Sequence, residues 1–213
     1  MSETKPIVQI VDDDVSFLTA TSRLLRASGF AVQTFSSASD FLARRVPDMP
    51  GCVVADLQMP GINGLDLQSA LAQTHNPPPL LFLTGHGDIP STVRAMRDGA
   101  VDFLEKRAPR ELLLDAVRRA LAQDTREREE RAHQRELRAR FHALSARELE
   151  VLSHVVQGKL NKQIAADLDI HVRTVKLHRT AITTKLHVHS VAELTRLTQK
   201  AGIFPQPTFP KGQ

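Results

Sequence analysis

Cys52-Val53-Val54-Ala55-Asp56-Leu57-Gln58-Met59-Pro60-Gly61 is the stretch that decides the fold. Its four leading apolar residues predict a short buried strand, and Asp56 stands at the C-terminal end of that strand. Similar apolar runs occupy residues 7–11, 31–35, 80–83 and 101–104, and helical patterns lie between them. Strands that alternate with helices predict parallel βαβ units, and therefore a doubly wound, five-stranded parallel sheet of the α/β class.

Polar side chains stand at the ends of four of these strands. They are Asp12 and Asp13, Asp56, Thr84, and Lys106. Right-handed crossovers bring the C-terminal ends of parallel strands to one edge of the sheet, so we expect these side chains to meet there. Mg2+ (or Mn2+) prefers hard oxygen ligands and takes only one or two carboxylates directly. Asp13 and Asp56 suit direct ligation, and Asp12 suits ligation through water.

This set of side chains suits phosphoryl transfer. Asp56 would attack a phosphoryl group in line, while Lys106 and the metal offset the charge on its equatorial oxygens and Thr84 donates a hydrogen bond to them. An Asp-nucleophile phosphatase uses the same groups and stays open, although it needs a spaced Asp-x-Asp pair and a substrate-covering cap. A simpler reading of residues 12–14 is that they cap the helix that follows.

Charge is divided unevenly along the chain. Residues 1–107 hold 9 Lys and Arg against 12 Asp and Glu, whereas residues 144–213 hold 10 against 5. An acidic first half and a basic last third indicate different partners, with nucleic acid expected for the second. No apolar run is long enough for a membrane span or a signal peptide. The single cysteine, Cys52, allows no internal disulfide, so we expect a cytoplasmic location without membrane contact.

A charged helix is expected between the two halves, because residues 124–140 are mostly Arg, Glu, Gln and Ala. We predict a helical linker over residues 122–143, between a first domain over residues 5–121 and a second over residues 144–201, with a flexible tail at 202–213. The linker is interpreted as a solvated helix. A dimerising coiled coil stays open, although apolar residues at its a and d positions are sparse.

The last 70 residues predict four helices and no strand. Ser145-Ala146-Arg147-Glu148 is a capping box, in which the Ser side chain caps the Glu amide and the Glu side chain reaches back. Asn161 is expected to cap a helix over residues 162–168. Two further helices are expected over residues 172–186 and 191–201. The fold class is thus an α/β domain followed by a small all-α, four-helix domain.

The helix over residues 172–186 has two contrasting faces at about 100° per residue. The face expected to pack on the domain contains Val175, His178, Ile182 and Leu186. The opposite face, polar and basic with one leucine, contains Arg173, Lys176, Leu177, Thr180 and Thr184. Such a face suits the major groove of DNA, where Lys176 would read guanine, Leu177 would touch a thymine methyl group and Arg179 would hold a phosphate.

Residues 5–121 resemble the receiver domain of two-component response regulators. The matching motifs are Val11-Asp12-Asp13-Asp14, residues 56–61, Thr84-Gly85-His86-Gly87-Asp88 and Asp102-Phe103-Leu104-Glu105-Lys106. The resemblance implies a flavodoxin-like fold in which Asp56 accepts a phosphoryl group from the phosphohistidine of a sensor histidine kinase. It also implies the backbone carbonyl of Gln58 as a metal ligand, Thr84 and Phe103 as the moving switch pair, and Gln58 and His86 as residues that tune phosphoryl lifetime.

Residues 144–201 resemble the LuxR-type helix-turn-helix domain of the NarL/FixJ family, and the segment at 84–88 favours its FixJ side. The matching runs are residues 144–148, 161–165 and 173–179. The resemblance implies DNA contacts from Arg173, Thr174, Lys176, Leu177, Arg179 and Thr180. It implies a phosphorylation-activated transcriptional regulator that forms a homodimer and binds promoter double-stranded DNA, with RNA polymerase as a candidate partner. Self-phosphorylation and self-dephosphorylation with Mg2+ would be its only enzymatic activities.

The sequence departs from these families at a few positions. Arg107 stands where proline usually follows the lysine, so the loop is expected to run with a trans peptide bond and to place Lys106 differently. Asp169 and His187 stand in turns where glycine is common, and His171 stands where a serine cap is usual. A turn that requires positive φ would then be strained. A DNA-binding module whose receiver acts without phosphate also stays open.

Overall fold

The computed structural model describes residues 5–85 and 89–203. The chain divides at residue 128 into two compact units, which we call the first unit and the second unit. The first unit contains β1 (Ile7–Val11), α1 (Val15–Ala27), β2 (Ala31–Phe35), α2 (Ala38–Arg44), β3 (Gly51–Ala55), α3 (Gly64–Ala72), β4 (Leu80–Thr84), α4 (Ile89–Arg97), β5 (Asp102–Glu105) and the start of α5 (Arg110–Phe141).

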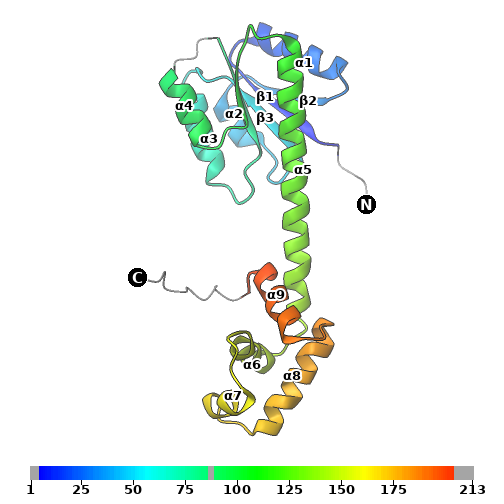
Figure 1. The fold of residues 1–213 in the computed structure, drawn as a ribbon. Coiled ribbons are helices and arrows are strands. Elements are labelled where there is room, and N and C mark those ends of the chain that lie inside the picture. Colours follow the sequence, from blue (N-terminus) through cyan, green and yellow to red (C-terminus); the bar gives the residue numbers. More distant parts are fainter. Residues whose placement is uncertain (1–4, 86–88, 204–213) are drawn as a thin grey trace. The chain divides into compact units, whose positions relative to one another are not determined.

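The five strands form one parallel sheet in the order β2-β1-β3-β4-β5. Figure 1 labels β1, β2 and β3 of this sheet. The predicted doubly wound α/β fold is therefore confirmed. Side chains that alternate along each strand serve two cores on opposite faces of the sheet. In β3, Val53 and Ala55 pack with α2 and α3 on one face, whereas Cys52 and Val54 pack with α1 and α5 on the other. All five residues of β3 are buried, as its continuous apolar run predicts.

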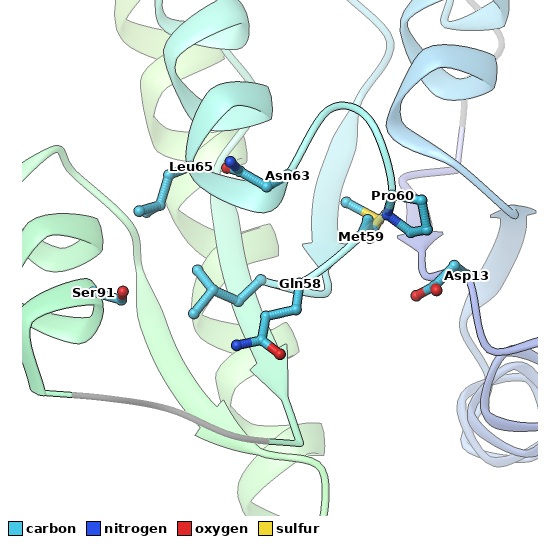
Figure 2. A pocket seen from close by; sticks show the side chains of 8 residues that line it. Asp13, Gln58, Met59, Pro60, Asn63, Leu65 and Ser91 are labelled. Carbon is cyan, nitrogen blue, oxygen red and sulfur yellow. The ribbon is translucent and has the colours of Figure 1, made fainter.

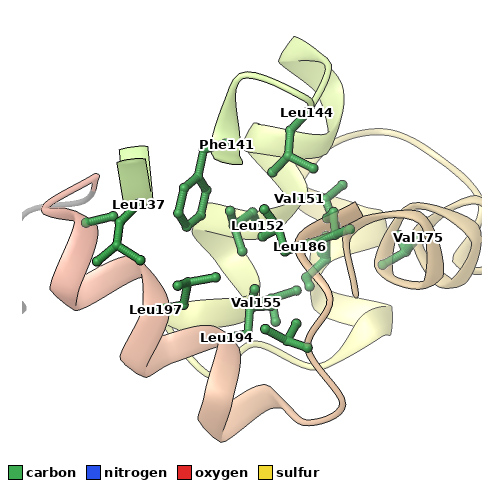
Figure 3. Packing of buried hydrophobic residues seen from close by; sticks show 14 of the residues in the cluster. Leu137, Phe141, Leu144, Val151, Leu152, Val155, Val175, Leu186, Leu194 and Leu197 are labelled. Carbon is green, nitrogen blue, oxygen red and sulfur yellow. The ribbon is translucent and has the colours of Figure 1, made fainter. Parts of the chain in front are cut away.

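The second unit is all-helical. It contains the end of α5 together with α6 (Ala146–Val156), α7 (Asn161–Asp167), α8 (Val172–Leu186) and α9 (Val191–Ala201). Leu152, Ile164 and Leu186 are fully buried in its single core, and Leu137 and Phe141 from the end of α5 pack into the same core (Figure 3). The predicted four-helix domain is confirmed, and the last turns of α5 belong to its packing.

Helix α5 runs without a break from Arg110 to Phe141. The expected charged linker is thus helical, and it continues the last helix of the first unit. Near its end, Arg138 Nε donates to the backbone oxygen of Ala201 at 2.8 Å, which fixes the C-terminal end of α9 to this helix. Across the described ranges, no helix has the length and apolar character needed to cross a membrane.

The capping box at the start of α6 is confirmed: Ser145 Oγ accepts from the Glu148 amide at 3.2 Å, and Glu148 Oε2 accepts from the Ser145 amide at 2.7 Å. The expected cap at Asn161 is wrong. Asn161 is the first residue of α7, and Leu160 occupies the cap position, where its amide donates to Gln163 Oε1 at 2.8 Å. The Asn161 side chain instead accepts a hydrogen bond from Arg179 of α8.

Both unusual turn residues of the second unit adopt left-handed conformations. The φ angles of Asp169 and His187 are 51° and 53°. A side chain in this region costs about 1 kcal/mol relative to glycine, so the strain anticipated from the sequence is present. His171 is the N-cap of α8 and makes no side-chain cap hydrogen bond. The turns before and after α8 are therefore less stable than they would be with glycine at positions 169 and 187 and with serine at position 171.

Candidate functional site

The residues predicted to form a phosphoryl site lie at the C-terminal edge of the sheet. Asp12 and Asp56 directly follow β1 and β3, Thr84 ends β4, and Lys106 follows β5. Asp12, Asp56 and Thr84 are almost completely buried, with exposed fractions of 1%, 6% and 0%. The sheet register that pairs Val11 with Ala55 brings the two aspartates to the same level, because each is the next residue of its strand.

Lys106 connects the two buried aspartates. Its Nζ atom lies 2.7 Å from Asp12 Oδ2 and 2.8 Å from Asp56 Oδ2. The same Nζ atom lies 4.5 Å from the centre of the Phe17 ring, a cation–π contact that the sequence reasoning missed. Arg107 does not move Lys106 away from the site, and every peptide bond in the described residues is trans. The expected trans peptide bond after Lys106 is confirmed.

A potential metal site lies beside this lysine. Asp12, Asp13 and Asp56 each offer an oxygen atom, and these atoms lie within 4.8 Å of one another. Carboxylate oxygens at this spacing fit Mg2+, which usually binds one or two carboxylates and keeps water or phosphate oxygens as its remaining ligands. Asp13 is exposed, so a cation entering from solvent meets this carboxylate first.

Burial and pairing act in opposite directions on the ionisable groups of the site. Burial raises the pKa of Asp12 despite the hydrogen bonds from Lys106 and from the Asp14 amide. Burial alone would lower the pKa of Lys106, but its hydrogen bonds to Asp12 and Asp56 outweigh burial and raise it. The lysine is therefore held as an ammonium, beside an Asp12 carboxyl group whose charged form is disfavoured by burial.

The third aspartate of the 12–14 run has a different role. Asp14 is the N-cap of α1, where its Oδ1 accepts from the amides of Ser16 at 2.9 Å and Phe17 at 3.1 Å. Its own amide donates to Asp12 Oδ1 at 2.9 Å. The helix-cap reading is thus correct for Asp14 alone, and the cap also orients Asp12.

An open pocket of about 530 Å3 adjoins the acidic cluster at Asp13. Figure 2 shows the Asp13 and Gln58 side chains facing the same opening, with Asn63 and Ser91 further along its rim. Gln58 is exposed, and its backbone N–H donates to Asp56 Oδ1 at 3.3 Å. The loop that carries Gln58 ends at Gly64. Only glycine fits at this position, because a Cβ atom there would lie 2.5 Å from the Asp56 backbone oxygen.

The two residues named by the resemblance as the switch pair lie on neighbouring strands, Thr84 at the end of β4 and Phe103 in β5. Thr84 is completely buried, and its backbone oxygen accepts from the Lys106 amide at 2.7 Å. Phe103 is partly buried against the core beneath α4, with its ring centre 6.0 Å from that of Phe82. His86 lies outside the described residues.

The DNA-facing helix predicted in the second unit is α8. Its buried side chains are Val175, Ile182 and Leu186, whereas His178 is half-buried. The opposite face is exposed at Arg173, Lys176, Leu177, Thr180 and Thr184. Leu177, which is 64% exposed, is the apolar member of this set. Thr174 is half-buried at the edge of this face.

Arg179 has a structural partner that the sequence did not reveal. Its Nη1 atom donates to Asn161 Oδ1 at 2.9 Å, which joins α8 to the first residue of α7. Lys185 on the same helix pairs with Glu148 of the capping box, with Nζ 2.7 Å from Oε2. Two side chains of α8 therefore hold it against α7 and α6, and the exposed face stays clear of these bonds.

Comparisons with known proteins give the family. A family model described as "Response regulator receiver domain" matches residues 8–118, and one described as "Bacterial regulatory proteins, luxR family" matches residues 142–198. The chain belongs to the NarL/FixJ family of response regulators. It is thus a DNA-binding transcriptional regulator with a receiver domain, and it belongs to no classical enzyme family.

Relatives match this response regulator over nearly their whole length. Nodulation protein W of Bradyrhizobium diazoefficiens is 42% identical over 202 residues, which cover 95% of this chain and 89% of the relative. Transcriptional regulatory protein FixJ of Azorhizobium caulinodans is 40% identical over 205 residues, covering 96% and 97%. The solved structure of the response regulator StyR has 45% identity and a TM-score of 0.76, covering 92% of this chain and 99% of that chain.

Proposed function

We propose that Asp56 accepts a phosphoryl group from the phosphohistidine of a sensor histidine kinase. The bond between phosphorus and the histidine nitrogen breaks as a bond to an Asp56 carboxylate oxygen forms. The observation that carries this assignment is Lys106 Nζ, 2.8 Å from Asp56 Oδ2 in a site that also gathers Asp12 and Asp13. A buried carboxylate with an ammonium beside it is ready to hold the added negative charge.

The metal ligands are proposed to be Asp12, Asp13, Asp56 and the backbone carbonyl of Gln58, with Mg2+ (or Mn2+) as the ion. A bound divalent ion would neutralise charge on the phosphoryl oxygens. Two residues of the chain would contact the phosphoryl oxygens as well. Lys106 is within reach of a phosphoryl group on Asp56, and Thr84 lies at the end of β4, the strand next to β3. Gln58, exposed beside the site, is placed to influence water access and phosphoryl lifetime, and the same role is proposed for His86.

Phosphorylation is proposed to change the surface built from α4, β5 and α5 through Thr84 and Phe103. This surface carries exposed apolar side chains that a second copy would cover: Ile89, Val93, Met96 and Leu112. Homodimerisation through it would present two copies of α8 to paired half-sites in promoter DNA. RNA polymerase is the further partner proposed for a promoter-bound dimer. A cytoplasmic location is proposed, since a regulator that binds promoter DNA works in the compartment that holds that DNA.

For its domains we propose a receiver over residues 5–121, a helical linker over 122–143, a DNA-binding domain over 144–201 and a tail over 202–213. DNA contacts are assigned to the exposed face of α8, with Arg173, Lys176, Leu177 and Thr180 at its centre and Thr174 and Arg179 at its edges. The support is that this face is basic, exposed and outside the bonds that hold the domain together.

Treatment of the full chain with acetyl phosphate and Mg2+ tests the phosphoacceptor. We expect intact mass to rise by one phosphoryl group in the parent protein and to stay unchanged in Asp56→Asn. Chelation of divalent ions should prevent the change in the parent. Equal phosphorylation of parent and Asp56→Asn would refute the assignment. Continuous release of phosphate from small phosphoesters would instead favour the phosphatase.

A further inference from the structure

Helix α5 carries a buried carboxylate beyond the part that matches the receiver family. That match ends at residue 118, yet Asp124 is only 3% exposed. Its Oδ2 atom accepts a hydrogen bond of 2.8 Å from the Gly51 amide, at the start of the central strand β3. A buried charge is costly unless it is paired, so Asp124 requires these partners to hold its position.

Arg128, one helical turn later, completes this contact. Its Nε atom donates to both Asp124 oxygens, at 2.9 Å and 2.8 Å. Its Nη1 atom donates to Asp48, to the backbone oxygen at 2.9 Å and to Oδ1 at 3.0 Å, and Nη2 donates to the Met49 backbone oxygen at 2.7 Å. The planar guanidinium spreads these donors over three nitrogen atoms, whereas a lysine ammonium carries all of its donors on one atom. We call Asp124, Arg128 and residues 48–51 the helix clamp.

Residues 48–51 of the helix clamp are themselves tightly constrained. Asp48 has a φ angle of 60°, in the left-handed region. A Cβ atom on Gly51 would lie 1.9 Å from the Ile7 backbone oxygen, so only glycine lets β3 begin beside β1 in this way. The Ile7 amide donates to the Pro50 oxygen at 2.9 Å, which attaches the same segment to the sheet. The clamp therefore joins α5 to the rigid centre of the first unit.

We propose that Asp124 and Arg128 are positioning residues that make residues 122–128 of α5 part of the receiver's rigid body. The connecting helix then leaves the receiver at Arg128, and any reorientation of the receiver on phosphorylation and dimerisation passes into this helix with no unwound residue between them. Each residue of an α-helix turns by about 100°, so even one unwound residue in this stretch would misdirect that movement. The inference rests on the proposed function, and it adds the elements that couple phosphorylation to DNA binding.

The test compares Asp124→Ala, Arg128→Ala and Asp124→Asn with the parent full-length protein. Arg126→Ala is the matched control, because Arg126 is an exposed arginine on the same helix. For each protein, three quantities are measured: phosphorylation by acetyl phosphate from intact mass, amide hydrogen exchange over residues 121–128, and DNA affinity with and without phosphorylation. The DNA is a fragment selected from a random-sequence pool by the phosphorylated parent.

We expect Asp124→Ala and Arg128→Ala to be phosphorylated like the parent, to exchange faster over residues 121–128, and to lose about fivefold or more of the affinity ratio between phosphorylated and unphosphorylated protein. Asp124→Asn keeps an acceptor for the Gly51 amide and should give an intermediate ratio. Arg126→Ala should match the parent.

Two outcomes would overturn the proposal: a parent-like affinity ratio in both alanine variants, or a loss of phosphorylation that accounts for their lower ratio. A parent protein that is phosphorylated but shows no affinity change would instead contradict the proposed function, whatever the variants do. The two failures are therefore distinguishable within one experiment.

Discussion

Lys106 lies between Asp12 and Asp56, with its Nζ atom 2.7 Å from one carboxylate and 2.8 Å from the other. These three residues come from the ends of three different strands, and only the parallel sheet brings them together. The ammonium partly neutralises two buried carboxylates in the unphosphorylated protein. A phosphoryl group on Asp56 would offer it a third anionic partner, which gives the lysine a direct part in the response.

Replacement of Lys106 tests that part. Lys106→Ala is expected to slow phosphorylation by acetyl phosphate by at least about tenfold, because it removes a preorganised positive charge from the reacting group. The rate is measured from intact mass over time in saturating Mg2+. Arg107→Ala is the control, since the neighbouring Arg107 is exposed. A parent-like rate for Lys106→Ala would show that the ion pair has no part in the transfer.

The adjacent aspartates of the 12–14 run allow a matched comparison of metal binding. Asp13→Ala should weaken Mg2+ binding, measured by titration calorimetry, because it removes one of three clustered carboxylates. Asp14→Ala should leave Mg2+ affinity close to that of the parent and lower the free energy of unfolding by about 1 kcal/mol, since it removes the cap of α1. The reverse pattern would mean that Asp14 is the ligand and Asp13 is not.

The second unit should lose stability in acid through Glu148. Its hydrogen bond from Lys185, followed by that from the Ser145 amide, lowers the pKa of Glu148 below its usual value of 4.5. A carboxyl group whose pKa is lowered by folding stabilises the protein above its unfolded pKa, and this contribution is lost as the pH falls through the folded pKa. Protection of α6 amides from hydrogen exchange should therefore be higher in the parent than in Glu148→Gln near neutral pH.

This advantage of the parent should shrink as the pH is lowered below 4.5, the usual pKa of a glutamate, and through the lower folded pKa of Glu148. Glu150→Gln is the control, because Glu150 is an exposed residue on the same helix whose partner is Arg147 on the surface. A parent-to-variant difference that is constant over this pH range would exclude an ionised Glu148 as its source.

Lys176 and Arg179 should affect DNA binding in different ways. Lys176→Ala is expected to abolish sequence-specific DNA binding, because it removes a side chain assigned to base contacts. The fold should stay intact, since Lys176 is exposed on the outer face of α8. Arg179→Ala is expected to reduce the salt dependence of binding by about one unit of slope if Arg179 holds a phosphate. It should also destabilise the pairing of α7 with α8, because it removes the hydrogen bond to Asn161.

Both DNA variants are measured by fluorescence anisotropy over a range of salt concentrations, with thermal unfolding followed in parallel. Asn161→Ala separates the two roles of Arg179: it removes the helix contact and keeps the guanidinium. If the dependence of DNA affinity on salt concentration is unchanged in Arg179→Ala, Arg179 does not bind a phosphate and has only its structural role. Unchanged operator affinity in Lys176→Ala would contradict the assignment of α8.

Much of the site follows from local sequence because strand ends can be located from it. The run that ends at Asp56 predicted both the central strand and its terminal carboxylate, and parallel order then placed Asp12 and Lys106 beside it. Positive φ angles at Asp169 and His187 were also foreseeable, since a helix that stops at a short turn often needs one.

The contacts that the sequence did not predict are long-range ones. Asp124 and Gly51 are 73 residues apart, and nothing in either neighbourhood indicates the other. Phe17 beneath Lys106 looks like an ordinary core aromatic in a helical stripe. The expected cap at Asn161 was wrong for the same reason: its amide serves Arg179 on another helix, and local cap preferences do not include such a competitor.

The central claim is that phosphorylation of Asp56 controls DNA binding. The most direct measurement is the affinity of the full-length protein for a selected DNA fragment, before and after treatment with acetyl phosphate and Mg2+, for the parent and for Asp56→Asn. The account predicts that affinity rises by about tenfold or more in the parent and stays unchanged in Asp56→Asn. An equal rise in both proteins, or no rise in a fully phosphorylated parent, would contradict it.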